Sequence, residues 1–356
     1  LDEARACFVA ALAARPDFPE ARRNLEALDA ASTTRATAGA GASVETAQSA
    51  DEHHLRGIHL YREGRFDEAL AAYDQSLALK PDAPATLNSR GFVLQDLDRM
   101  DEALACFERA VALAPEFAMA RLNLGMAQLK LGHWRAGWDN YEARWTGSAE
   151  ATNGQMARPP SSLPQWDGQG GTGTQRLLVI TEQGFGDTFQ FARYLALAAD
   201  RFAKVGFVCS GPTQRLMEWA CSDRIVFMTR MPSDFDAWDW QCPLMSLPRA
   251  FRTTPETIPA NVPYLTVPAV TAAHWCERLD LAAPGRLRIG IAWAGRKGHQ
   301  YDRRRSLAFR RIAPLLTDDR VTWVSLQKWT AEEGPPQVPA DVDWLDWTEE
   351  IGRAHV

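Results

Sequence analysis

Apolar residues in the first half of the chain recur at the spacing of amphipathic helices, and the whole pattern repeats every 34 residues. The segments FDEALAAYDQSLALKP (66–81) and MDEALACFERAVALAP (100–115) align without a gap, and LDEARACFVAALAARP (1–16) follows the same unit. A small residue such as Ala69 lies four positions before an aromatic residue such as Tyr73, and therefore on the same helix face. A small residue there lets two antiparallel helices approach closely, so the pattern predicts repeated helical hairpins.

These positions resemble the tetratricopeptide repeat (TPR). The matching residues are Gly57, Ala69, Tyr73, Pro81, Gly91, Ala103, Phe107, Ala110 and Pro115. The resemblance implies a TPR array of three repeats over residues 51–149, with a partial repeat at 1–30. Residues 31–50, rich in Ala, Thr, Gly and Ser, have too few large apolar side chains to form a core and are expected to be a flexible linker.

The third copy of the repeat departs from the pattern. In residues 122–145, Gly137 and Arg144 replace Ala residues and no Pro closes the unit, which predicts a terminal repeat that packs on another part of the chain. We expect the aromatic residue of each repeat to fill the groove to the next helix. The concave groove of such a stack usually binds a protein or peptide, although a spacer that only positions the next domain is the alternative.

The hydrophobic pattern changes after residue 175 to short apolar runs that alternate with helical segments. The β-α-β order predicts a parallel sheet with helices on its faces, while the Pro-spaced stretch 242–268 is expected to be irregular. The predicted strands lie within 176–180, 204–210, 224–228, 286–295 and 321–328, and the predicted helices are 188–199, 213–221, 269–279 and 309–316.

These patterns predict an α + α/β fold: a TPR helical-hairpin array followed by Rossmann-like domains. A Gly- and Pro-rich connector (150–175) leads into a first Rossmann-like domain at 176–284. Three glycines of the connector, at 168, 170 and 173, match the spacing of a dinucleotide-binding fingerprint. We attribute this match to chance, because it precedes the predicted strand instead of following it. A second Rossmann-like domain begins at 285–350 and has about two strands, where a doubly wound domain usually has more.

The ends of the chain suggest a fragment. The sequence begins at Leu1, inside a repeat unit, and Ile351–Val356 match the peptide that a common sequencing adaptor encodes. We therefore expect 351–356 to be an artefact, with a genuine polar tail as the alternative.

Composition narrows the functional classes. The chain has 356 residues with a net charge of −6, so we expect no nucleic-acid partner. No apolar run reaches the roughly 18 residues of a membrane span. None of the six Cys residues forms a CxxC pair and most lie inside apolar patterns, so reduced core thiols in a cytoplasmic protein are expected, with no disulfide framework or zinc site.

The first candidate functional site is the loop TEQGFGDT (181–188), which follows a predicted strand. Ligands of open α/β sheets bind beyond the carboxyl ends of strands. Gly184 and Gly186 would allow positive φ and close approach of a ligand to the backbone. Asp187 would lie at the start of the next helix, where chemistry is one interpretation and a helix N-cap is the other.

The second candidate cluster is basic. Residues 286–311 hold eight Arg, one Lys and one Asp, a local charge of +8 in an acidic chain. Guanidinium groups match phosphate oxygens in pairs, so the loop suits phosphate, with a solvated basic face as the alternative. Ser325, Gln327 and Lys328 end the next strand and are expected to face the same edge.

The motif run also resembles a known enzyme family. LLVITEQGFGDTFQFARYL, CPLMSLPRAF, TIPANVPYL, GIAWAG, DRRRS and SLQK, preceded by the repeats and PQWDG, are similar to bacterial TPR proteins with a C-terminal region of the heptosyltransferase family, glycosyltransferase family 9. The resemblance covers residues 1–350 and implies the two-Rossmann GT-B fold. It also implies metal-independent transfer of a sugar from a nucleotide-sugar donor to an acceptor hydroxyl, with no cofactor.

The resemblance assigns roles to residues. Asp187 would be the general base, with Gln183, Gly184 and Gly186 as the acceptor loop. The remaining candidates would bind the donor phosphates: Arg296, Lys297, Arg303, Arg304, Arg305 and Lys328. Asp234-Phe235-Asp236 forms a D-x-D that we attribute to chance, so no metal site is predicted.

Two other functions stay open from sequence. The chain is either a non-catalytic TPR scaffold whose α/β region is structural, or a nucleotide-binding regulatory protein in which the basic loop matters and Asp187 does not. The sugar-transfer hypothesis predicts that this chain does not transfer sugar by itself, because the second Rossmann-like domain is short.

Overall fold

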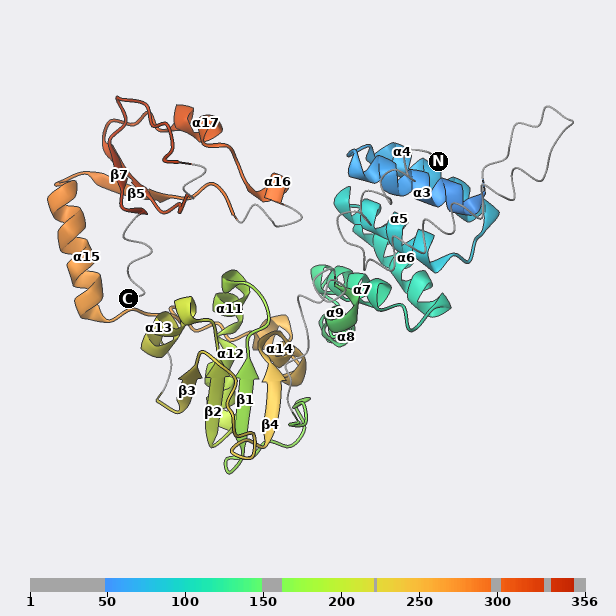
Figure 1. The fold of residues 1–356 in the computed structure, drawn as a ribbon, viewed down its shortest axis with the longest axis horizontal. Coiled ribbons are helices and arrows are strands. Elements are labelled where there is room, and N and C mark those ends of the chain that lie inside the picture. The colour runs from blue at the N-terminus through green and yellow to red at the C-terminus, as the bar shows by residue number, and fades with distance from the viewer. Residues whose placement is uncertain (1–48, 149–161, 221–222, 296–301, 330–333, 349–356) are drawn as a thin grey trace, which may run out of the picture. The chain divides into compact units, whose positions relative to one another are not determined.

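The computed structural model describes residues 49–148, 162–220, 223–295, 302–329 and 334–348 (Figure 1). The chain divides into two compact units, Leu1–Pro81 and Asp82–Val356. The predicted partial repeat, most of the predicted linker and the predicted artefact at 351–356 lie outside the described residues.

The described part of the first unit is one helical hairpin, α3 (Ala50–Arg62) and α4 (Phe66–Leu79). Ser49 caps α3 through a reciprocal pair of hydrogen bonds with Glu52, of 3.2 and 2.9 Å, so this helix starts where two free N–H groups find side-chain acceptors. The ring of Tyr73 occupies the space that a Cβ on Gly57 would need. The aromatic residue therefore closes its own hairpin, and whether it also fills the groove to the next helix stays a prediction.

The second unit begins with the hairpins α5 (Pro84–Asp96) with α6 (Met100–Leu113) and α7 (Ala118–Lys130) with α8 (Trp134–Tyr141), followed by the short α9 (Arg144–Gly147). Phe107 repeats the contact of Tyr73, because a Cβ on Gly91 would come within 2.7 Å of its ring. In the terminal hairpin the backbone of α8, and not an aromatic ring, lies against Gly125. A Cβ on Gly125 would lie 2.7 Å from the backbone nitrogen of Tyr141.

The first sheet has four parallel strands in the order β3-β2-β1-β4. They are β1 (Arg176–Ile180), β2 (Lys204–Val208), β3 (Ile225–Met228) and β4 (Trp240–Pro243), and β1 pairs with β2 on one side and β4 on the other. The helices that connect or follow the strands are α11 (Phe185–Phe191), α12 (Tyr194–Arg201), α13 (Gly211–Ala220), the 3-10 turn η1 (Leu244–Ser246) and α14 (Leu247–Ala250).

The two faces of this sheet are covered differently. Leu177 and Val179 face the main core with Leu195 of α12 and the fully buried Trp166. Leu178 and Ile180 face the other side, where they pack with Trp238 of a loop. Alternate residues of β1 thus point to opposite faces, as the pleat requires, and both faces are dry. Trp166 lies within the predicted connector, so that part of the connector contributes to the core.

The second sheet has three parallel strands, β5 (Leu287–Ile291), β6 (Val321–Ser325) and β7 (Trp344–Asp346), in that order. The third strand was not predicted from sequence. The neighbouring helices are α15 (Ala269–Ala282), α16 (Asp302–Arg305), α17 (Phe309–Ile312) and the 3-10 turn η3 (Ala313–Leu315).

Three further expectations need correction. The stretch 242–268 is not irregular throughout, because it includes the end of β4, η1, α14 and the 3-10 turn η2 (Pro255–Thr257). The predicted helix 188–199 is two helices that meet at residues 192–193. Of the cysteines in the described ranges, three are buried, but Cys276 is exposed on α15.

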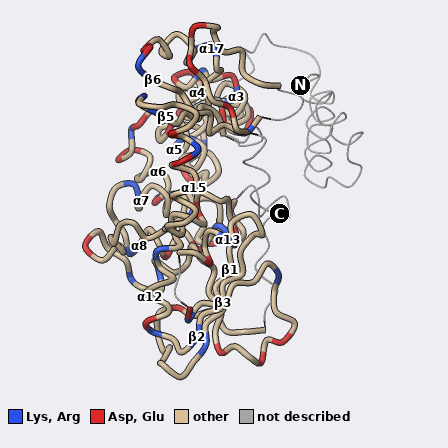
Figure 2. The backbone as a smooth tube through the Cα atoms, turned by 90° about the vertical axis from the view of Figure 1, so that its left-hand side faces the viewer, with Lys and Arg blue, Asp and Glu red and all other residues tan. Residues whose placement is uncertain are grey.

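Charged residues of both signs are interspersed along the described chain, as Figure 2 shows. None of the helices in the described ranges combines the length and the apolar character that crossing a bilayer requires.

Candidate functional site at the carboxyl edge of the first sheet

The connection order of the first sheet marks one position on its edge. The chain leaves β1 for β2 and β3 on one side, and then returns to the other side of β1 as β4. In open parallel sheets, ligand crevices form where the connections from two adjacent strands diverge, at the carboxyl ends of those strands. Here that position lies between the loop 181–184 after β1 and the turn η1 after β4.

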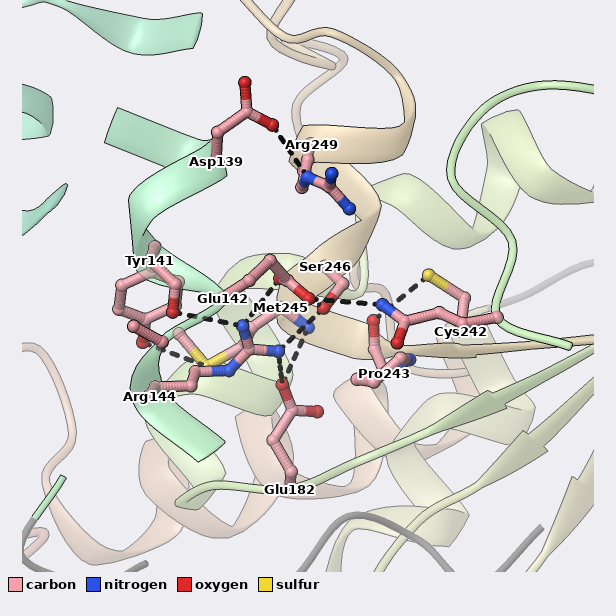
Figure 3. Close-up of polar contacts among 12 residues, drawn as sticks. Asp139, Tyr141, Glu142, Arg144, Glu182, Cys242, Pro243, Met245, Ser246 and Arg249 are labelled. Atoms are coloured by element: carbon pink, nitrogen blue, oxygen red, sulfur yellow. Dashed lines mark hydrogen bonds and ion pairs between the residues drawn. The ribbon is translucent and has the colours of Figure 1, made fainter. Parts of the chain in front are cut away.

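A side chain from the repeats occupies this position. Arg144 of α9 is 1% exposed, and its guanidinium donates to Glu182 of the β1 loop at 2.9 Å and to Ser246 of η1 at 2.7 Å. It also donates to Glu142 at 2.7 Å, and Ser246 donates to the same Glu142 oxygen. Figure 3 shows the Arg144 guanidinium among these partners. The terminal repeat therefore does pack on another part of the chain, as its departure from the repeat pattern suggested.

Further contacts join the same segments. The Gln183 side-chain amide donates to the Tyr141 hydroxyl at 3.2 Å, and the Gln165 amide donates to Glu142 at 3.1 Å. Arg249, after η1, donates to Asp139 of α8 at 2.8 Å. Both strand ends are thus bonded to the last hairpin of the repeats.

The buried charges do not balance one to one, because a single guanidinium faces two carboxyl groups. Burial raises the pKa of Glu182 to about 7, and the attraction of Arg144 offsets only part of that shift. Burial acts in the same direction on Glu142, but Arg144 and the hydrogen bond from Ser246 outweigh it and lower its pKa. Arg144 remains charged, since the two carboxylates raise its pKa against the opposing effect of burial.

Glu182 is the residue of this site best suited to act as an acid or base. Its side chain is 3% exposed, one carboxyl oxygen accepts from Arg144 and from the Met245 backbone N–H, and the other oxygen is buried without a partner among the described residues. A carboxyl group that titrates near neutrality can give or take a proton at physiological pH. Our sequence prediction missed Glu182. The signal was Arg144, a charge at a repeat position that normally packs in the core and must therefore have a buried acidic partner.

The predicted acceptor loop has a different geometry from the expected one. Gly184 is the N-cap of α11 with φ −67°, and Gly186 is not among the described residues with positive φ. A Cβ on Gly186 would meet nothing within 4 Å. The loop conformation thus does not require these glycines, and the positive-φ argument is wrong.

Asp187 is the third residue of the seven-residue α11 and not its N-cap, so the capping interpretation is also wrong. Its side chain is half-buried and close to Gly184, with 3.6 Å between a carboxylate oxygen and a Cβ at that position. Whether Asp187 acts as a base stays a prediction.

The carboxyl edge of the second sheet holds a larger cavity, of about 750 Å³. Trp293 and Phe309 line it on one side, and Gln327, Lys328 and Trp329 line it from the end of β6. The Gln327 side-chain oxygen accepts from the backbone N–H groups of Trp293 at 3.2 Å and Ala294 at 2.9 Å, so it fixes the loop after β5 to the loop after β6.

The predicted phosphate-binding residues are only partly brought to this cavity. Lys328 lines it, and the exposed Arg305 lies against Gly295 of the loop after β5. Arg303 and Arg304 lie in α16, and Arg296 and Lys297 are outside the described residues.

Two arginines counted in the basic cluster are neutralised by acidic residues outside it. Arg286 pairs with Asp343 and Arg288 pairs with Asp280. The effective charge of the cluster is therefore smaller than the sequence count of +8.

The described residues contain no group of three or more His, Cys, Asp or Glu side chains that could hold a metal ion. Asp234 accepts from the backbone N–H of Asp236, which makes the D-x-D a local turn.

Comparison with known proteins gives one relative and several structures. Protein FlbA of Caulobacter vibrioides is 26% identical in a match covering 74% of this chain and 47% of the relative, so the chain spans about half the length of that protein. The first TPR of Spaghetti (RPAP3) bound to the HSP90 peptide SRMEEVD is 24% identical, covers 32% of this chain and 93% of that chain, and has a TM-score of 0.28. YrrB, described as a TPR protein with an unusual peptide-binding site, is 22% identical, covers 31% of this chain and 56% of that chain, and has a TM-score of 0.28.

The family comparison bears on the first half of the chain. A tetratricopeptide repeat model matches residues 55–122 and does not extend to either sheet. Residues 55–122 thus carry tetratricopeptide repeats.

Proposed function

We propose that this chain recognises a protein or peptide on its repeat array and holds it next to the carboxyl edge of the first sheet. Two exposed methionines of α7 support recognition. Met119 is 39% exposed and Met126 is 36% exposed, and their spacing of seven residues puts them on one face of the helix. Methionine side chains are flexible and polarizable, which suits a surface that adapts to an apolar ligand side chain.

The observation that carries the proposal is the buried bond network of Arg144. A ligand on α7 would lie on the hairpin whose end contacts Glu182, Ser246 and Gln183. Because the two contacts of Arg144 are short and its side chain is buried, the ligand would be held in a fixed relation to the β1 loop.

A screen of the chain against a displayed peptide library, with affinities of selected peptides measured by calorimetry, tests recognition. We expect Met119→Ser with Met126→Ser to weaken binding at least tenfold, since each substitution removes apolar contact area. Val270→Ser, which changes an exposed apolar residue of α15 away from the repeats, is the matched control. The proposal fails if no peptide is selected, or if the two variants bind selected peptides equally well.

A second candidate function is metal-independent sugar transfer from a nucleotide-sugar donor, with the two sheets as Rossmann-like domains of the GT-B kind. The cavity at the second sheet supports it, because about 750 Å³ lies within the roughly 300–1,000 Å³ range of small-molecule sites. The aromatic side chains there would suit stacking with the nucleobase of the donor. Lys328 with arginines from 296–305 would neutralise its diphosphate. Asp187 would be the general base, and Gln183 would orient the acceptor hydroxyl.

Calorimetric titration with UDP, GDP and ADP tests the donor half of this proposal. Lys328→Ala should weaken binding of the preferred diphosphate, whereas Arg320→Ala, at an exposed surface pair with Asp318, should not. Asp187→Asn should leave diphosphate binding intact in this chain, and should remove transfer in a longer chain with a complete second domain. If none of the three diphosphates binds, sugar transfer by this chain is excluded and the scaffold function remains.

A further inference from the structure

A second, smaller cavity lies between α8 and α14. It has a volume of about 240 Å³ and is lined by α8, by the segment around Asp167, by Arg249 of α14 and by the residues that follow α14. This cavity shares no lining residue with the β1 loop or with Met119 and Met126, so a ligand bound in it would be independent of the proposed function.

Arginine is the dominant charged residue of this lining. Arg135, Arg249 and Arg252 line the cavity, against Asp139 and Asp167. Neither Arg135 nor Arg252 forms an ion pair with an acidic side chain in the described part of the chain. Asp139 is already paired with Arg249, at 2.8 Å. One oxygen of Asp167 accepts the backbone N–H of Gln169 at 2.9 Å. Three cations therefore face two anions whose oxygens are partly engaged.

The lining also holds a neutral donor without an acceptor. Trp138 is 9% exposed, its ring packs edge-on against Phe191 at 6.1 Å, and its indole N–H is buried with no hydrogen-bond partner among the described residues. A buried donor of this kind lowers stability unless an acceptor reaches it. That N–H is closed off from the cavity, so the contacts available to a ligand come from the arginines.

Arg252 occupies a backbone position that an arginine disfavours. Its φ is 52°, and it follows the end of α14, where its N–H donates to Arg249 at 2.9 Å and the N–H of Thr253 donates to Pro248 at 2.8 Å. Glycine is the common residue at such a left-handed helix end, because it has no Cβ. The backbone thus gives no reason for arginine here, whereas its guanidinium adds a cation to the cavity.

We propose that this cavity binds a small oxyanion, a phosphate or carboxylate group of a ligand, through Arg252, Arg135 and the free N–H groups of Arg249. Guanidinium groups pair with such oxygens through two parallel hydrogen bonds. The volume is below that of drug-sized sites, which limits the ligand to a small molecule or to one end of a larger one.

The test is calorimetric titration of the intact chain with inorganic phosphate and, separately, with acetate, at low ionic strength. Wild type should bind at least one of the two, and the preferred anion shows whether the site favours a phosphate or a carboxylate. Arg252→Gly should weaken binding at least tenfold while the protein melts at the same or a higher temperature, because glycine suits the left-handed backbone. Trp138→Phe keeps the ring and removes the N–H, which the cavity does not reach, and should leave anion binding unchanged.

Arg320→Gln, an exposed arginine outside the cavity, is the control and should bind like wild type. The proposal is overturned if neither anion binds wild type, or if Arg252→Gly binds as tightly as Arg320→Gln.

Discussion

The guanidinium of Arg144, in the last helix of the repeats, lies 2.9 Å from the carboxyl group of Glu182, at the end of the central strand pair of the first sheet. Both side chains are almost fully buried, and Glu142 shares the same cation. This contact joins the two kinds of structure in the chain, helical repeats and a parallel sheet. It therefore determines how the second unit responds to substitution and to pH.

Removal of Arg144 should destabilise the second unit severely. Arg144→Met leaves two buried carboxyl groups without their cation, and breaking a buried pair in this way costs about 3–5 kcal/mol. Urea unfolding would measure the change. Arg109→Ala, which removes an exposed pair with Asp82, is the matched control and should cost less than about 1 kcal/mol. Equal effects of the two substitutions would contradict the buried geometry.

The stability of the protein should depend on the protonation of Glu182. Its pKa is about 7 in the fold and near 4.5 in the unfolded chain, so the folded state binds the extra proton between these values. Stability from this group is therefore greatest at low pH within that window and falls as the pH rises from about 4.5 to 7, by at most about 3 kcal/mol.

Glu182→Gln isolates this effect because the amide does not titrate. His54, whose pKa burial lowers, changes stability in the opposite direction, so the readout is the difference between the wild-type and variant curves of unfolding free energy against pH. We expect that difference to vary between about pH 4.5 and 7. Parallel curves would show that Glu182 does not titrate in this range.

Two glycine substitutions should have opposite signs. Gly91→Ala places a Cβ about 2.7 Å from the Phe107 ring, and such overpacking costs about 1–3 kcal/mol. Gly186→Ala meets no atom within 4 Å in the first turn of α11, and alanine is the better helix former by up to about 1 kcal/mol. Thermal unfolding of both variants checks this. If Gly186→Ala lowers the melting temperature, the loop conformation differs from the one described.

The helical repeats were predictable because their signal is local and periodic. The glycine and the aromatic residue recur at a fixed spacing, and the first two described hairpins repeat the same contact, Gly57 with Tyr73 and Gly91 with Phe107. The parallel strands β1, β2, β3, β5 and β6 were also predicted, since each is a short apolar run.

The strand β4 was missed for a physical reason. It has four residues, ends in Pro243 and pairs with β1 on one side, so its stability comes from that pairing and not from a local pattern. Without β4, the divergence of connections between β1 and β4 could not be located.

The candidate site was only partly predictable. The loop 181–187 was identified, because a strand followed by glycines and a carboxylate is visible in sequence. Glu182 was not identified from sequence, because its pKa depends on burial and on Arg144. Arg144 lies 38 positions earlier, in the helical repeats. The replacement of alanine by Arg144 in the terminal repeat was noticed, but its partner could be identified only from the structure.

Hydrogen exchange of the native protein, compared between wild type and Arg144→Met, tests whether the last repeat hairpin is fixed to the carboxyl edge of the first sheet. We expect the variant to exchange faster in two separate segments together, α8–α9 (134–147) and the β1 loop with α11 (181–191), while α4 of the first unit is unchanged. Faster exchange in only one of those two segments, or in neither, would show that the hairpin and the sheet edge are not held together by Arg144.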